Sequence, residues 1–167
     1  PPQPKGNIEP LWQMLGVTFD PKQVVWQAYN PYPQIPNFPQ EFVFVDNGVK
    51  ETTEPFNARS PATSKLQQLL FLFPGSLQRK HSAGLDYTPL VRTGTQSGEL
   101  PYTDILEPGL FGGGGGLNPT RFNKARFTQE EYQLAAWIHG RPRSENQPMS
   151  AAGLHDAAQD DAQGGDA

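Results

Sequence analysis

Short runs of apolar residues, separated by turns rich in Pro and Gly, follow one another along this chain. Apolar positions at i, i+3, i+4 and i+7 predict an amphipathic helix over residues 7–16, with Gly16 at its end. Brief runs of β-branched and aromatic residues predict strands. These strands fall at residues 23–28, 41–45, 69–73, 87–92 and 130–140, and Pro89 marks an edge or a bulge in the fourth.

The segment LQQLLFLFPGSL, residues 66–77, carries the longest of these apolar runs. Its five large apolar residues are far fewer than the roughly 18 to 20 that a membrane helix needs. Continuous apolar runs are typical of strands covered on both faces, as in parallel sheets flanked by helices. We therefore expect a buried central strand, stopped by Pro74-Gly75. A helix over 61–68 precedes it; the alternative is one continuous helix over 61–73.

Between these elements the pattern predicts loops. Four prolines in residues 30–40 predict an extended surface loop, because each fixes its own φ and removes a backbone donor. PYTDIL, residues 101–106, predicts a single helical turn, and the glycine-rich loop 109–119 is too flexible to pack by itself. Residues 141–167 lack aromatic and β-branched side chains. We expect a domain over 1–140 and a disordered acidic, Ala- and Gly-rich tail over 141–167.

Composition narrows the function classes. With 17 Gly, 18 Pro and 35% hydrophobic residues, the core must be small for 167 residues. The absence of Cys excludes disulfides, thiolate metal sites and cysteine nucleophiles. Residues 1–143 contain all 13 Lys and Arg residues but only 12 of the 17 acidic residues, because the other five acidic residues follow Arg143. The net charge of residues 1–143 is therefore close to zero. It gives no sign of the clustered basic surface that nucleic-acid binding requires.

Residues with catalytic potential give weak signals. Ser76 follows a predicted strand, but it is followed by Leu77 and Gln78, whereas the pattern G-x-S-x-G needs a second glycine there; a turn is therefore favoured over a nucleophile. The glycine run lacks the Lys and Ser/Thr of a phosphate loop. The histidines are widely spaced and the carboxylate pairs adjoin basic residues, so we expect no metal, no cofactor and no acid–base pair. These residues are His81, His139 and His155, Asp104 and Glu107, and Glu130 and Glu131.

The predicted proline loop carries aromatic side chains, Tyr29, Tyr32 and Phe38, which either stack on a sugar or partner surface or cover the edge of the core. Arg92 in a strand edge implies an anion or carboxylate partner, or else a structural ion pair with Asp86 or Glu99. The chain begins at Pro1 without Met or a leader segment, so we expect a fragment of a longer protein.

The order of four segments resembles a known family: VVWQAYNPYPQIPNFPQEFVFVDNG, TSKLQQLLFLFPGSL, GLDYTPLVRTGTQSGELPYTDIL and EEYQLAAWIHG. That family is the auxiliary, substrate-binding component of ABC transport systems associated with gliding motility. The most specific matches are LFLFPGSL, residues 70–77, and TPLVRTG, residues 88–94, and the resemblance covers residues 11–140.

The resemblance implies an α/β domain with a mainly parallel sheet flanked by helices. Such three-layer folds are related to class I glutamine amidotransferases, to flavodoxin and to intraflagellar transport-like domains, and this chain would be the C-terminal part. It also implies an extracytoplasmic, periplasmic-side location with a membrane anchor elsewhere in the protein, and ABC permease and ATPase subunits as partners. No catalytic residue carries over, because the amidotransferase nucleophile is a cysteine.

In open α/β sheets, ligands bind beyond the carboxyl ends of strands. This rule gives Ser76, Arg92 and Thr93 as predicted ligand- or partner-binding residues, with Tyr32 as a neighbour. Two alternatives stay open beside a non-enzymatic transport accessory. One is a carbohydrate-binding or carbohydrate-processing domain, and the other is a degenerate amidotransferase or hydrolase.

Overall fold

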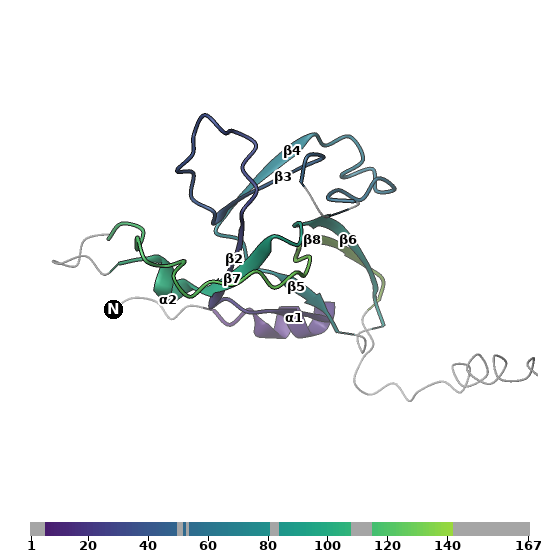
Figure 1. The fold of residues 1–167 in the computed structure, drawn as a ribbon. Coiled ribbons are helices and arrows are strands. Elements are labelled where there is room, and N and C mark those ends of the chain that lie inside the picture. Colours follow the sequence, from purple (N-terminus) through teal and green to yellow (C-terminus); the bar gives the residue numbers. More distant parts are fainter. Residues whose placement is uncertain (1–5, 50–51, 53, 81–83, 108–114, 142–167) are drawn as a thin grey trace, which may run out of the picture.

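The computed structural model describes residues 6–49, 52, 54–80, 84–107 and 115–141 (Figure 1). Short strands dominate, with one short helix near the start and one helical turn later. The elements in chain order are α1 (Glu9–Leu15), β1 (Val17–Phe19), β2 (Gln23–Gln27), β3 (Phe42–Asp46), β4 (Gln68–Leu72), β5 (Leu77–Arg79), β6 (Asp86–Arg92), β7 (Ser97–Pro101), α2 (Tyr102–Ile105) and β8 (Gln133–His139).

The described strands form four antiparallel pairs: β1 with β5, β2 with β7, β3 with β4, and β6 with β8. The predicted α/β fold, with its mainly parallel, amidotransferase-like or flavodoxin-like three-layer sheet, is therefore wrong. The reason is that a continuous apolar run reports burial on two faces but not what covers them. Here other strand pairs and loops supply the cover, and the two described helices have only seven and four residues.

Most local predictions are confirmed. Helix α1 ends at Gly16 in a left-handed conformation, with φ of 65°, and PYTDIL contains the helical turn α2. All five predicted strands occur, shifted by a few residues at most. The helix over 61–68 is wrong, because residues 61–65 form turns. Strands β1, β5 and β7 were missed, since two are three residues long and β7 reads SGELP.

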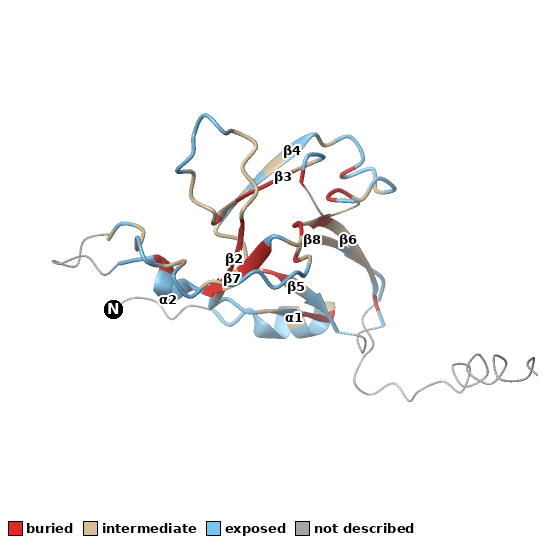
Figure 2. Cartoon of the chain, viewed as in Figure 1, coloured by how far each residue is buried: buried red, intermediate tan, exposed pale blue. Residues whose placement is uncertain are grey.

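Strand β2 lies between two apolar clusters. Its neighbouring residues alternate between them, because successive side chains of a strand point to opposite faces. The first cluster consists of Val25, Val43, Val45, Phe56, Val91, Tyr132 and Leu134. The second consists of Val24, Trp26, Leu100 and Ile105. Figure 2 shows the resulting buried colour on β2 and β7 at the centre of the ribbon.

A loop segment covers the second cluster from outside. Leu117, Phe122 and Ala125 pack against it, and Phe122 meets the Trp26 ring edge-on with centroids 5.3 Å apart. Arg121 in the same segment forms an ion pair with the buried carboxylate of Glu41, which directly precedes β3. A carboxylate inside a protein is costly unless it is paired, so this contact holds the segment in place.

Candidate functional site

Strand β4 has one covered face and one open face. Leu69 and Phe71 pack on the first cluster, whereas Leu70 and Leu72 are 45% and 60% exposed. The prediction of a central strand buried on both faces is therefore wrong. Among the strands that the structure describes, β4 pairs with β3 alone, so its other edge has no strand partner. Figure 2 colours β4 largely as intermediate and exposed.

The proline loop covers the neighbouring part of the same sheet face. Phe38 packs on Phe44 and Phe42, with ring centroids 5.1 and 5.7 Å apart, and Tyr32 meets Phe44 edge-on at 5.3 Å. Phe44 lies opposite Leu70 in the register, and Phe42 lies opposite Leu72. We call Phe42, Phe44, Leu70 and Leu72 the outer face of β3 and β4. Aromatic rings cover its β3 half, and its β4 half is exposed.

Polar contacts fix the end of this outer face. The Tyr29 hydroxyl donates to Asp46 Oδ1 at 2.7 Å, and Gln68 Nε2 donates to Asp46 Oδ2 at 3.1 Å. The Tyr32 hydroxyl donates to Gln68 Oε1 at 2.7 Å. Burial, and then the hydrogen bond and charge of Asp46, raise the pKa of Tyr29 to about 12. These hydrogen bonds connect the proline loop to β3 and β4, and Leu70 and Leu72 of β4 remain exposed.

The segment Pro74-Gly75-Ser76 leads the chain away from β4. Phe73 has a positive φ of 50°, and the next carbonyl, that of Pro74, accepts from Val25 N of β2 at 2.7 Å. A Cβ atom on Gly75 would lie 2.3 Å from the Phe19 ring, so only glycine allows this approach. Ser76 is buried and donates to Glu99 Oε1 at 2.7 Å. This geometry differs from the Ser–His pair of nucleophilic serines.

A polar cleft of about 320 Å³ opens beside Ser76. Residues 76–79 line one side and residues 130–133 line the other. Burial is the main cause that raises the pKa of the Tyr132 hydroxyl there.

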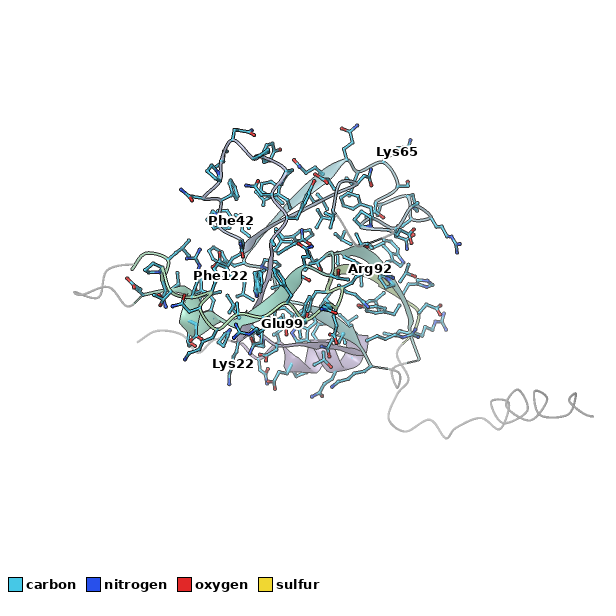
Figure 3. All side chains as sticks on the ribbon, viewed as in Figure 1. Lys22, Phe42, Lys65, Arg92, Glu99 and Phe122 are labelled. Atoms are coloured by element: carbon cyan, nitrogen blue, oxygen red, sulfur yellow. The ribbon has the colours of Figure 1, made fainter. Side chains whose placement is uncertain are left out.

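Two more of the predicted binding residues contact the 130–133 segment. Arg92 lies 3.5 Å from Glu131, so its partner is neither Asp86 nor Glu99 (Figure 3 labels Arg92 and Glu99). Thr93 is fully buried, and its Oγ1 accepts from Tyr132 N at 2.9 Å. The structure thus brings Ser76, Arg92 and Thr93 to one region, while Tyr32 lies apart on the proline loop.

Other candidate chemistry is sparse in the described part of the chain. No three His, Asp or Glu residues there are placed to hold a metal ion, and none of its helices has the character of a membrane span. His139 lies 3.6 Å from Asp86. His81, His155, residues 112–114 of the glycine run and residues 142–167 of the predicted tail lie outside the described residues.

Comparison with known proteins gives one match. A family model described as "ABC-type uncharacterized transport system" matches residues 1–163. This chain belongs to that family. Its members are auxiliary components of ABC-type transport systems, which confirms the resemblance read from residues 11–140 at the level of the transport family. No curated protein and no solved structure matches the chain.

Proposed function

We propose that this chain is a non-catalytic, extracytoplasmic auxiliary domain of an ABC transport system of the gliding-motility type. In this proposal the domain binds a subunit of the same transporter through the open half of the outer face of β3 and β4. The observation that carries the proposal is the exposure of Leu70 and Leu72 on a strand whose free edge has no partner among the described strands. Family membership supports a partner within a transport system.

The geometry favours a protein partner with an extended apolar segment. A free strand edge offers unpaired backbone N–H and C=O groups, which a partner strand pairs by β-augmentation. Alternate side chains of that strand would then contact Leu70 and Leu72. The contacts of Tyr29, Tyr32, Gln68 and Asp46 hold the outer face in its present shape. A preformed surface loses little conformational entropy on binding.

The polar cleft is a separate part of the proposal. Ser76 lines it, Arg92 lies next to it through Glu131, and Thr93 supports Tyr132 from the buried side. We propose Ser76 and Arg92 as contacts for a polar ligand or partner group, with Thr93 in a supporting role and Tyr32 beside the outer face. Exchange of Arg92 for Ala would then weaken binding while the domain stays folded.

The test uses the intact gene product, tagged in its native membrane, cross-linked and purified in mild detergent. Mass spectrometry should recover an ABC permease and its ATPase with the wild-type protein. A double substitution, Leu70→Asn with Leu72→Asn, should lower that recovery about tenfold, because two apolar contacts are replaced by amides.

The matched control is Ile8→Asn with Leu11→Asn, which changes two exposed apolar residues of similar size on and beside α1. This control should leave the recovery unchanged. Absence of both transporter subunits from the wild-type sample would refute the transporter partnership. Equal losses in the two double variants would instead refute the role of β4.

A further inference from the structure

A second cavity lies on the β6 and β8 pair, and it shares no lining residue with the polar cleft or with the outer face of β3 and β4. Its volume is about 280 Å³, near the lower end of the roughly 300–1,000 Å³ range of small-molecule pockets. Trp137 of β8 and Thr88 of β6 are direct neighbours in the register and both line it. The remaining lining comes from a loop before β4: Asn57, Arg59, Ser60, Pro61 and Ala62.

Trp137 is unusual for its exposure. It is 56% exposed, although tryptophan is one of the most strongly buried residues on average. Its position on an antiparallel pair gives it a rigid backbone, so exposure is not a consequence of a mobile segment. Large exposed aromatic rings beside a cavity are common where a ligand supplies the missing contact.

The loop opposite Trp137 is held in place by its own hydrogen bonds. Asn57 Nδ2 donates to Pro89 O at 2.9 Å, and Asn57 N donates to Leu90 O at 2.9 Å. Thr63 Oγ1 donates to Asn57 O at 2.8 Å from the buried side. The cavity wall is therefore attached to β6 at two points and is formed before any ligand arrives.

The polar groups of the wall are available for a ligand. The guanidinium group of Arg59 forms no ion pair with any residue in the described part of the chain, and its backbone N–H is the group that contacts Asn57. The Thr88 hydroxyl has no hydrogen-bond partner among the described residues, and Ser60 Oγ only accepts, from Ala62 N at 3.3 Å. One cation and two hydroxyl groups thus surround an apolar wall of indole and proline.

We propose that this cavity binds one unit of an acidic saccharide, with a pyranose ring packed on Trp137 and its carboxylate paired with Arg59. A pyranose ring has an apolar C–H face, which matches the indole, and a rim of hydroxyl groups, which need donors and acceptors. The hydroxyl groups of Thr88 and Ser60 supply these at the rim. The guanidinium group suits a carboxylate because two parallel N–H groups reach both of its oxygens.

The cavity and the proposed contact at β4 are independent of each other. The two surfaces are built from different residues: the cavity uses Trp137, Thr88 and residues 57–62, and the outer face uses β3 and β4. A purified chain in solution tests the cavity, whereas the β4 contact needs transporter subunits. Failure of one experiment therefore leaves the other unaffected.

The test is a calorimetric titration of the purified chain with trigalacturonic acid, with maltotriose as the uncharged relative of similar linkage. Trigalacturonic acid should bind about tenfold more tightly, because the carboxylate adds a charge-assisted hydrogen bond. Trp137→Ala should weaken binding about tenfold or more, and Trp137→Phe should keep most of it. Arg59→Gln should bring the acidic sugar to the level of maltotriose.

Tyr102→Ala serves as the matched control, since Tyr102 is a 48% exposed aromatic residue outside the cavity. Thermal unfolding of each variant shows that it is folded. No heat from either sugar at millimolar concentration would overturn the proposal, as would unchanged binding by Trp137→Ala. Equal affinity for both sugars would overturn the acidic class. Preference for a proline-rich peptide over both sugars would assign the cavity to protein recognition instead.

Discussion

Strands β2 and β4 have similar apolar runs and opposite surroundings. In β2, Val24, Val25 and Trp26 are all buried, because one cluster lies on each side of the strand. In β4, only alternate residues of the run LLFL are partly buried, namely Leu69 and Phe71, and Leu70 and Leu72 are exposed. The difference lies in the covering segments, since residues 117–125 close the second face of β2 and no described segment covers β4 in the same way. An apolar run thus indicates a surface that is stabilised by burial. The tertiary structure decides whether another segment of the same chain covers that surface.

The largest expected effect comes from removing a buried side chain of β2. Trp26→Ala should lower the free energy of unfolding by about 4 kcal/mol, because the rings of Phe122 and Phe127 would face an empty volume. The exposed Trp137→Ala should change it by less than about 0.5 kcal/mol. Urea unfolding followed by circular dichroism measures both. A similar loss for the two tryptophans would break the contrast between covered and open faces.

The next effect concerns the attachment of the covering segment. Arg121→Met leaves the Glu41 carboxylate buried without its cation, which should cost about 3 kcal/mol. The second cluster should also become accessible to solvent, so that β2 would have one exposed face, as β4 does. A double variant, Arg121→Met with Glu41→Leu, should recover part of the loss, because no unpaired charge remains. No recovery in the double variant would show that the ion pair is not what holds the segment.

A smaller effect should appear at high pH through Tyr29. Its pKa is raised to about 12 in the folded chain, against about 10 in an unfolded one, so folding favours the protonated phenol. The stabilisation is complete below pH of about 10 and is lost as the pH rises towards 12. Tyr29→Phe should therefore show a shallower fall of stability over that window. Burial also raises the pKa of Tyr87 and Tyr132, so some slope should remain. Identical slopes for the two proteins would place Tyr29 outside this linkage.

The smallest effect on stability is expected on the open face of β4. Leu70→Asn and Leu72→Asn should each change the free energy of unfolding by less than about 0.5 kcal/mol. Phe71→Asn, one position away and packed on the first cluster, should cost several times more. Chemical denaturation of the three single variants gives the comparison. A large loss from Leu70→Asn would mean that this face is already covered within the chain.

The candidate sites were only partly predictable from the sequence. Ser76, Arg92 and Thr93 were predicted from a parallel-sheet rule that this fold does not obey, yet they meet around residues 130–133. They do so because β6 pairs with β8, and because Ser76 lines the same cleft as Gln133 at the start of β8. Trp137 was not singled out. The available signal was its place in an alternating strand, on the opposite set of positions from Tyr132, Leu134 and Ile138.

Features decided within a few residues were predictable from the sequence alone. The strands β2, β3, β4, β6 and β8, the left-handed end of α1 at Gly16 and the end of β4 before Pro74-Gly75 belong to this group, because local propensity and turn residues determine them. Strand direction and the covered faces were decided only by the tertiary structure. β1 pairs with β5, and Glu41 meets a partner 80 residues away. Such contacts depend on which distant surfaces bury each other best, and an apolar run has the same appearance whichever partner covers it.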